Sequence, residues 1–407
     1  MLTAFFILAA LLTIQSLIAL QDGPRFLAFV RRRLAESMPD YAPPATLICP
    51  CKGLDDELEH NLTSLVEQDY PNLEIVFVIA SGDDPARVVC ERVAAKARRP
   101  ARVVVAGEPK GRGEKVNNLL AGVAAARAES EVFVFADSDG RPGANWVRKL
   151  VARLALSAAG QADREVGAAS TFRWYLPAGD FLSGLQSAWN APAVTYMGEW
   201  DRNFCWGGGT AIRRQTFYEI EAPRYWSGCV SDDYMLTRAL RAAGRQIVFV
   251  PQCLVTTHHA TTWSKLIEWT TRQLLLTRVY EPRLWWPGMG VHVFYCGVFL
   301  YGFGLAAWLL PPRPGSGWTT SAVILLTLAA ISALSVAKGV YRLAAVQWLM
   351  PEHAEQLRRT WWSPTLQAAL APWLMALAFL LSARTRRLTW RGVTYELRSP
   401  WETRVLR

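Results

Sequence analysis

Long apolar segments near both ends of this 407-residue chain limit what it can fold into. The first, Leu2 to Leu20, carries no charge, and three more follow towards the C-terminus: Met289 to Leu310, Thr319 to Val336 and Leu366 to Leu381. Each is close in length to a membrane-crossing helix of about 20 residues. A membrane protein is therefore predicted, in agreement with a composition that is 51% hydrophobic and only 19% charged.

Arginines after the first apolar segment predict its orientation. Arg25 and Arg31 to Arg33 follow Leu20, and basic residues concentrate on the cytoplasmic side of membrane segments. A cleaved signal peptide would instead have basic residues before the apolar segment and small residues at its end. Residues 1–24 are thus predicted to be an uncleaved transmembrane anchor and 25–44 a linker.

The basic residues at the C-terminus conflict with a simple count of membrane crossings. The tail 384–407 is rich in arginine and is predicted to be cytosolic, with the turn Pro311 to Gly315 on the outside. Three full crossings within 285–383 would export that tail. One apolar segment is therefore expected to be re-entrant, to be broken at Pro372, or to lie along the interface.

Short apolar runs alternate with longer helical stretches in the first half of the chain. Strands are expected at Ala45 to Cys49, Glu74 to Ala80, Ala101 to Val105 and Glu131 to Ala136, with helices near Asp55 to Glu67, over Pro85 to Ala97 and over Lys115 to Ala126. Strands of about five apolar residues separated by helices of ten or more are typical of a parallel sheet with helical crossovers. The sequence predicts an α/β domain of the nucleotide-binding type over 45–284.

Paired acidic residues follow two of these predicted strands. Asp137 and Asp139 come directly after the fourth strand, at the edge where such sheets bind ligands. Carboxylates at this spacing can share a hard divalent cation, which neutralises a diphosphate leaving group. Asp83 and Asp84 follow the second strand and can accept hydrogen bonds from a base or a ribose. The alternatives are a solvated acidic turn for the first pair and a helix cap for the second.

Other patterns suit contacts with phosphate. Lys110 to Leu119 is a Gly-rich basic turn that opens a helix, without the spacing of a Walker A sequence. The consecutive glycines Gly207 to Gly209 let the backbone approach a ligand closely. Asp232 and Asp233 begin an amphipathic helix, where an ionised carboxylate acts as a base or merely as a cap. Trp269 to Arg278, just before the membrane segments, is by itself more often an interfacial anchor.

Charge and cysteine content narrow the class of protein. The formal net charge of +10 suits a chain that faces anionic lipid and a phosphate-bearing substrate, although a nucleic-acid binder would have a similar charge. The seven cysteines are scattered without a CxxC pair, so neither a disulfide framework nor a structural zinc site is indicated. Reducing cytoplasm is the expected compartment, with no nucleic-acid partner.

The order of these motifs resembles the inverting family 2 type glycosyltransferases of the GT-A fold, and most closely their ceramide glucosyltransferase-like branch. The resemblance covers nearly the whole chain and includes Pro50 to Gly53, Asp69 to Pro71, Asp83 to Ala86 and Lys115 to Leu119. It implies donor-binding roles for Asp83, Asp84, Lys115, Asn118, Asp137, Gly208, Arg272 and Arg278. It further implies a metal ion at Asp137 and Asp139, and Asp233 as general base with Asp232 beside it.

One motif departs from the family pattern. The family usually closes with Gln/Arg-x-x-Arg-Trp, whereas here Arg272 is followed by Leu275 and Leu276 where Arg-Trp is expected. Either Arg272 or Arg278 substitutes for the missing arginine, or the donor or acceptor differs from the family norm.

The sequence thus predicts an inverting, metal-dependent hexosyltransferase in the cell inner membrane, with its catalytic domain facing the cytoplasm. It would use Mg²⁺ or Mn²⁺ to move a sugar from a nucleotide-sugar such as UDP-glucose to a hydroxyl of a membrane lipid, for example a ceramide, a hopanoid or a diacylglycerol. The alternatives are a non-catalytic membrane protein that binds nucleotide-sugar or lipid, and a processive polysaccharide synthase. The aromatic-rich stretch Trp174 to Met197 is either a core helix or an interfacial helix that admits the lipid.

Overall fold

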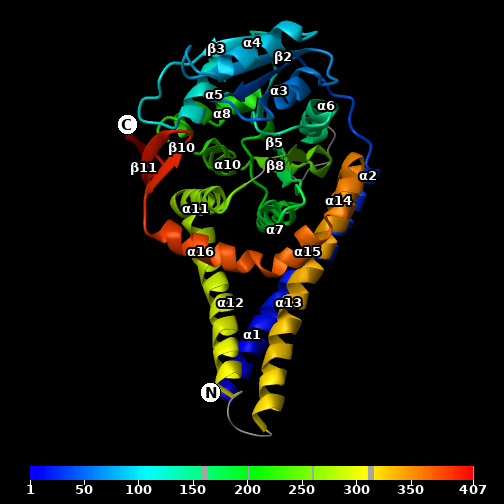
Figure 1. The fold of residues 1–407 in the computed structure, drawn as a ribbon. Coiled ribbons are helices and arrows are strands. Elements are labelled where there is room, and N and C mark those ends of the chain that lie inside the picture. The colour runs from blue at the N-terminus through cyan, green and yellow to red at the C-terminus, as the bar shows by residue number, and fades with distance from the viewer. Residues whose placement is uncertain (158–163, 200, 259–260, 310–315, 407) are drawn as a thin grey trace. The chain divides into compact units, whose positions relative to one another are not determined.

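The computed structural model describes residues 1–157, 164–199, 201–258, 261–309 and 316–406. The chain forms two compact units (Figure 1). The membrane unit consists of Met1–Val30, Leu176–Thr195 and Ala260–Arg384, and the sheet unit of Arg31–Tyr175, Tyr196–His259 and Thr385–Arg407. The predicted turn Pro311 to Gly315 lies outside the described residues.

A mixed sheet forms the centre of the sheet unit. Its strands among the described residues are β1 (Ala45–Pro50), β2 (Leu73–Ile79), β3 (Ala101–Val105), β4 (Val132–Ala136), β5 (Val166–Ser170), β7 (Gly209–Arg213) and β8 (Gln246–Phe249), in the order β3-β2-β1-β4-β7-β5-β8. The first four strands of that order are parallel, as predicted. β7, however, runs antiparallel to both β4 and β5, so the sheet is not wholly parallel. This direction pairs Gly209, at the start of β7, with Ala136, at the end of β4.

Helices cover both faces of the sheet, which explains why most of its strands are apolar. These are α3 (Leu58–Val66), α4 (Ala86–Lys96), α5 (Glu114–Ala125), α6 (Trp146–Ala152), α8 (Arg214–Glu219), α9 (Ala222–Tyr225) and α10 (Asp232–Ala242). Every residue of β2 and β4 is buried, as expected for strands covered on both faces. α5 approaches the sheet closely at Gly122, where an added Cβ would lie 2.4 Å from Ile48 Cγ2.

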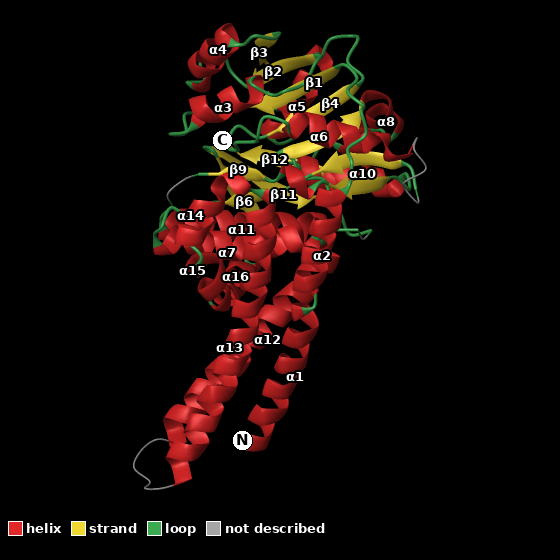
Figure 2. Cartoon of the chain, turned by 90° about the vertical axis from the view of Figure 1, so that its right-hand side faces the viewer, coloured by secondary structure: helices red, strands yellow, loops and turns green. Residues whose placement is uncertain are grey.

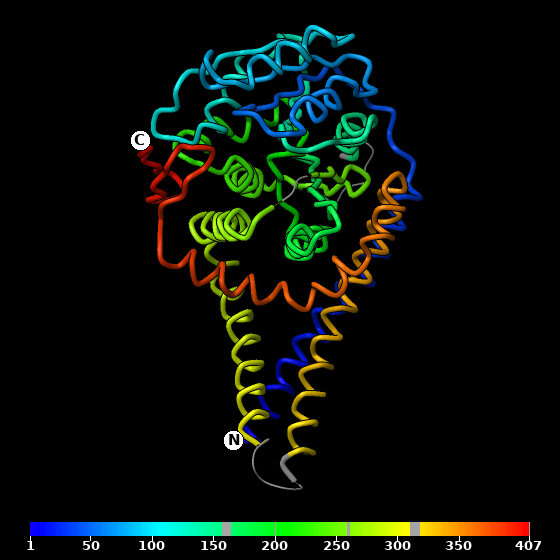
Figure 3. The backbone as a smooth tube through the Cα atoms, viewed as in Figure 1, coloured from blue at the N-terminus to red at the C-terminus, as the bar shows by residue number. Residues whose placement is uncertain are grey.

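The C-terminal segment is a folded part of the sheet unit and not a loose tail. β10 (Arg387–Trp390), β11 (Val393–Ser399) and β12 (Glu402–Leu406) form an antiparallel sheet, red in Figure 3. β10 and β11 are joined by Arg391 and Gly392, whose φ values of 46° and 81° are those of a tight primed turn. Burial of Tyr395 and Leu397 fixes the register. A separate parallel pair joins β6 (Arg173–Tyr175) to β9 (Val255–Thr257).

The membrane unit is helical. It contains α1 (Leu2–Leu20), the first part of α2 (Asp22–Ala35), α7 (Phe181–Tyr196), α11 (Trp263–Tyr280), α12 (Pro282–Leu309), α13 (Ser316–Leu349), α14 (Ala354–Arg359), α15 (Trp362–Leu366) and α16 (Ala371–Ala383). α1, α12 and α13 pack side by side (Figure 2). Within the described residues, three helices are long and apolar enough to cross a membrane: Leu2–Ala35, Pro282–Leu309 and Trp318–Leu349. The region 25–44, expected as a linker, is helical up to Ala35 because apolar residues such as Phe26 and Val30 recur at helical spacing and are buried.

The last apolar segment is bent. Trp362–Ala369 and Ala371–Ala383 meet at an angle of 62°, next to Pro372. Proline lacks the N–H that would continue the preceding helix, which explains the break at this point. Within α7, Leu185 and Trp189 belong to an apolar cluster of the membrane unit, while Phe181 is 47% exposed.

Candidate active site

An acidic cluster lies where β4 ends and α10 begins. The ammonium of Lys115, from the first turn of α5, is 2.7 Å from Asp137 Oδ1 and 3.3 Å from Asp232 Oδ1. Lys115 therefore joins members of two acidic pairs that stand about a hundred residues apart in the sequence.

Arg173 on β6 holds the other side of this cluster. Its guanidinium donates two hydrogen bonds of 3.0 Å to the two oxygens of Asp139 and one of 2.8 Å to Asp137 Oδ2. The same group lies 5.0 Å from the centre of the Trp206 ring and 5.6 Å from that of Tyr175. A planar, bidentate cation stacked on aromatic rings is well suited to bridging two carboxylates. Arg173 is not among the predicted site residues, because its only signal in the sequence is a lone arginine within the apolar and aromatic run that follows β5.

Glycines allow the backbone to pass close to these side chains. An added Cβ on Gly207 would lie 2.2 Å from Asp232 Oδ2 and 2.5 Å from Lys115 Nζ, and one on Gly208 would lie 2.6 Å from Asp137 Oδ2. Gly208, predicted as a donor-binding residue, is thus next to the carboxylates. Any larger residue at these two positions would displace the acids or the lysine.

Burial and charge perturb the ionisation of the cluster. Burial raises the pKa of Asp232 to about 7, against the opposing effect of Lys115. Burial acts against the charge of Lys115, but Asp137, Asp232 and Asp233 raise its pKa well above the usual range. Burial likewise acts against the charge of Asp139, yet Arg173 holds the pKa of that carboxyl well below its usual range.

Asp233 is the more accessible carboxylate at the start of α10. Its Oδ1 accepts a hydrogen bond of 2.8 Å from the Tyr234 amide and one from the Ser231 hydroxyl, while Asp232 is buried against Lys115. Asp233 therefore lies in the first turn of a helix and is partly exposed to solvent.

The two residues of the second acidic pair, Asp83 and Asp84, have different surroundings. Asp84 Oδ1 accepts hydrogen bonds of 2.9 Å from the amides of Gly53 and Ala86, so it joins the loop after β1 to the first residue of α4. Asp83 is exposed and remains available to a ligand. Asn118 is 2% exposed within α5, so its side chain does not face solvent.

The two arginines predicted to bind the donor lie on α11 in the membrane unit. Arg278 donates a hydrogen bond to the carbonyl of Ser382, and its guanidinium is 5.9 Å from the centre of the Trp285 ring. Both contacts pack α11 against neighbouring helices of its own unit. Arg272 lies on the same helix, almost two turns earlier.

A different arginine lies in the sheet unit with the carboxylates. Arg391, in the β10–β11 turn, is 2.6 Å from Asp55 Oδ2 and donates to the carbonyl of Lys52. Its charge acts on both Asp137 and Asp139. Sequence reasoning assigned Arg391 to a cytosolic tail, because nothing local shows that the C-terminal strands pack beside α5, where Tyr395 accepts a hydrogen bond of 3.2 Å from the Glu114 amide.

The carboxylates suit a hard divalent cation in their chemistry. Mg²⁺ and Mn²⁺ prefer oxygen ligands, and Mg²⁺ commonly binds through one or two carboxylates together with substrate phosphates and water. Asp139, whose side chain is 39% exposed, is the more accessible of the two carboxylates, and Asp137 is the less accessible. Among the described residues, no three His, Cys, Asp or Glu side chains form a metal-binding group.

The cysteines give no sign of a nucleophile. All seven are buried free thiols. Burial raises the pKa of Cys205 and of Cys229, which disfavours the reactive thiolate at both positions.

Comparison with known proteins identifies relatives in part of the chain. A ceramide glucosyltransferase of Komagataella phaffii (strain GS115) is 32% identical over 101 residues, which cover 24% of this chain and 20% of the relative. Ceramide glucosyltransferase 1 of Caenorhabditis elegans is 31% identical over 102 residues, 23% of this chain and 22% of the relative. The matched region therefore spans only about a fifth of the length of these relatives.

Solved structures give weaker similarity. A mannosyltransferase from Pyrobaculum calidifontis in complex with GDP-mannose and Mn²⁺ is 19% identical, covers 91% of this chain and 99% of its own, and has a TM-score of 0.42. Glucosyl-3-phosphoglycerate synthase from Mycobacterium tuberculosis in complex with Mn²⁺ and UDP-glucose is 14% identical, with coverages of 58% and 79% and a TM-score of 0.34. Both scores are too low to establish a shared site.

One protein family matches nearly the whole chain. Residues 5–403 match the family described as Glycosyl transferase family 21. The resemblance to glycosyltransferases of the ceramide glucosyltransferase-like branch is thereby confirmed, as is the prediction of an α/β domain combined with long apolar helices near both ends of the chain. The chain belongs to Glycosyl transferase family 21.

Proposed function

We propose that this protein transfers a hexose from a UDP-sugar to a hydroxyl of a membrane lipid, with inversion at the anomeric carbon. The observation that carries the proposal is the cluster in which Lys115 and Arg173 join Asp137, Asp139 and Asp232 beside the more exposed Asp233. Family membership supports sugar transfer, and the partial similarity to ceramide glucosyltransferases supports a lipid acceptor. Ceramide is therefore the first acceptor to test.

In this proposal Asp233 is the general base. It accepts the proton of the lipid hydroxyl as the oxygen attacks the anomeric carbon, and the bond from that carbon to the diphosphate breaks on the opposite face. One base and one displacement invert the configuration, so no covalent sugar–enzyme intermediate is needed.

Cationic groups receive the leaving diphosphate. Lys115 and Arg391 supply positive charge from the protein, and Asp83 offers hydrogen-bond acceptors for the ribose or base. Asp139 and Asp137 would hold a divalent cation, which when bound neutralises charge that develops on the diphosphate.

We further propose that the sheet unit faces the cytoplasm at the cell inner membrane. Arg31 to Arg33, next to the first apolar helix, favour this side. Because Thr385–Arg407 belongs to the sheet unit, the chain crosses the membrane an even number of times between His259 and Thr385. α12 and α13 provide two crossings, so the bent pair α15–α16 would enter and leave on the same side.

The test is transfer by the purified full-length protein. UDP-glucose, UDP-galactose and GDP-mannose are each offered with ceramide or diacylglycerol, the glycolipid is identified by mass spectrometry, and its anomer by NMR. Asp233→Asn should lower turnover at least about a hundredfold, the usual size of a general-base contribution, while UDP affinity stays within a few-fold. Asp201→Asn, at an acid whose side chain is 76% exposed, is the matched control and should keep full activity. Donor binding without any glycolipid product would favour a non-catalytic binding protein.

A further inference from the structure

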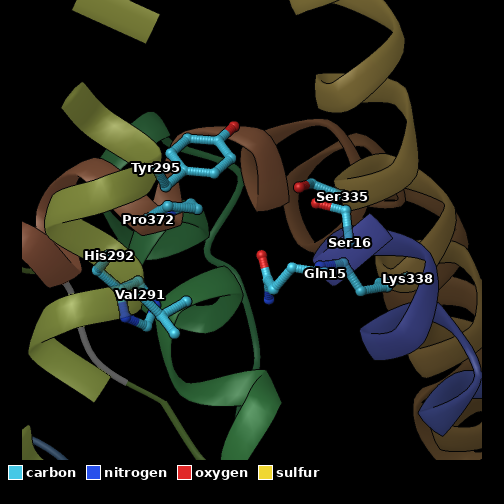
Figure 4. Close-up of a pocket in the computed structure, with 8 residues that line it drawn as sticks. All are labelled: Gln15, Ser16, Val291, His292, Tyr295, Ser335, Lys338 and Pro372. Atoms are coloured by element: carbon cyan, nitrogen blue, oxygen red, sulfur yellow. The ribbon is translucent and has the colours of Figure 1, made fainter. Parts of the chain in front are cut away.

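The membrane unit contains a polar pocket between its apolar helices. Six polar residues line it: Gln15 and Ser16 of α1, His292 and Tyr295 of α12, and Ser335 and Lys338 of α13 (Figure 4). It is partly open to the surroundings and leaves about 60 Å³ of space for the centres of water-sized molecules. Polar and ionisable residues are costly inside a membrane and mark functional sites there more often than not.

The buried hydroxyl of Tyr295 in this pocket lacks a well-aligned hydrogen-bond partner within the described residues. Tyr295 is 5% exposed, and its ring is stacked on Phe299 at a centroid distance of 4.5 Å, so the side chain is held in place. Figure 4 shows its ring among the side chains that line the pocket. The hydroxyls of Ser332 and Ser335 lie near that of Tyr295, but neither forms a well-aligned hydrogen bond to it in the described part of the chain. A bound polar ligand would give this buried hydroxyl a full hydrogen bond.

The polar groups of the pocket favour an anion. Lysine has only donors, the hydroxyls and the glutamine amide can donate, and no carboxylate lines the pocket among the described residues. Two further charges act on Lys338, the positive charge of Arg342 and the negative charge of Asp22. Two cations against one acid leave an excess of positive charge around the pocket.

The depth of the pocket matches that of lipid head groups. A crossing of about 20 residues, counted along α13 from Ser316, reaches Ser335, and one counted back along α12 from Leu309 reaches Gly290. The polar residues of the pocket thus cluster near the end of the hydrocarbon region that lies away from the 310–315 connection. Phosphate groups of the bilayer lie just beyond this level.

We propose that this pocket binds the phosphate of a membrane phospholipid, distinct from the lipid that accepts sugar. Lys338 pairs with the phosphate, and the hydroxyls of Tyr295, Ser16 and Ser335 donate hydrogen bonds to its oxygens. The acyl chains remain in the bilayer against the exposed apolar faces of the helices. The inference does not depend on the proposed transferase activity, because it concerns residues of the membrane unit alone.

Native mass spectrometry of the full-length protein in a neutral detergent tests this inference. The protein is titrated with dioleoyl phosphatidylglycerol and, separately, with dioleoylglycerol, which has the same chains but no phosphate. The wild type should retain one phospholipid, with at least about tenfold tighter binding than for the diacylglycerol. Lys338→Met and Tyr295→Phe should each weaken phospholipid retention about tenfold, whereas Lys265→Met, at an exposed lysine of α11, should leave it unchanged.

Tyr295→Phe keeps the proposal falsifiable should Lys338→Met fold poorly, because the change removes one oxygen atom. Unchanged retention in a folded Tyr295→Phe variant, or equal binding of phospholipid and diacylglycerol, would overturn the proposal. A third arm adds inorganic phosphate. If millimolar phosphate displaces the lipid completely, the pocket is a site for free anions and the assignment to a lipid is wrong.

Discussion

Replacement of Arg173 by methionine tests whether this residue holds the acidic cluster together. The change removes three hydrogen bonds, two to Asp139 and one to Asp137, and leaves Asp139 without its nearest cation. Breaking a fully buried pair costs about 3–5 kcal/mol. Here the side chain of Asp139 is 39% exposed, and Lys115 still pairs with Asp137, so solvent and lysine recover part of that loss. A loss of about 2–3 kcal/mol in the free energy of unfolding follows.

The same change should strengthen binding of a divalent cation. In the Arg173→Met variant, Mn²⁺ no longer competes with a guanidinium for the oxygens of Asp137 and Asp139. Mn²⁺ should therefore bind about tenfold more tightly than to the wild type in the absence of UDP. Mn²⁺ should then restore part of the lost stability, since a ligand that binds the folded state stabilises it. Neither effect requires activity to be measured.

Thermal unfolding of the full-length protein with and without Mn²⁺, together with the EPR signal of free Mn²⁺, measures both effects. Arg148→Met is the matched control, because Arg148 lies at 3.6 Å from Asp69 in an exposed pair and its loss should change stability by less than about 0.5 kcal/mol. Unfolding of the Arg173→Met variant at the wild-type temperature, with no gain in Mn²⁺ affinity, would refute the role assigned to Arg173.

Stability should depend on pH through Asp232. The pKa of Asp232 is raised to about 7 from its ordinary value of 3.8, so the folded state binds a proton more tightly than the unfolded state, and the free energy of unfolding should fall as the pH rises from about 4 to 7. Urea unfolding of Asp232→Asn should lack this pH dependence, and an identical pH slope in both proteins would contradict the prediction. Arg391→Ala should weaken UDP binding about tenfold by calorimetry, whereas Arg398→Ala, at a half-exposed residue of the same sheet, should not. Leu185→Glu should prevent folding, because Leu185 is 4% exposed in an apolar cluster, whereas Phe181→Glu, at a residue that is 47% exposed, should fold and, if α7 admits the lipid, lower lipid transfer alone.

Local patterns explain why much of the sheet unit could be predicted. The four expected strands correspond to β1 to β4 within one residue at each end, because each is a short apolar run, and β1, β2 and β4 are also covered on both faces. The acids after β4 and at the start of α10 also lie together, since strand ends and helix starts are readable from the sequence itself. Lys115 was found for the same reason, in a basic turn that begins a helix.

Contacts between distant segments could not be predicted in this way. Arg173 and Asp137 are 36 residues apart and meet because β6 pairs with β9 outside the main sheet. Arg391 is 339 residues from Lys52, whose carbonyl it contacts, and it has its place because three short strands pack as a sheet at the end of the chain. A single sequence shows neither the β6–β9 pairing nor the packing of the C-terminal strands. The residues around an arginine in a basic tail or an aromatic run are the same whether or not that arginine binds a carboxylate.

The charges at the candidate site bear on how a nucleotide-sugar would bind. Four carboxylates, those of Asp137, Asp139, Asp232 and Asp233, lie among the cations Lys115, Arg173 and Arg391, so the fully ionised cluster carries a net charge of minus one. A diphosphate would add about two further negative charges to a site that is largely buried, where uncompensated charge costs several kcal/mol. A divalent cation that arrives with the donor removes that excess, whereas a metal ion alone must compete with Arg173 for both acids. The donor and the cation should therefore bind together, with Mn²⁺ affinity that is weak by itself and rises at least about tenfold when UDP is present.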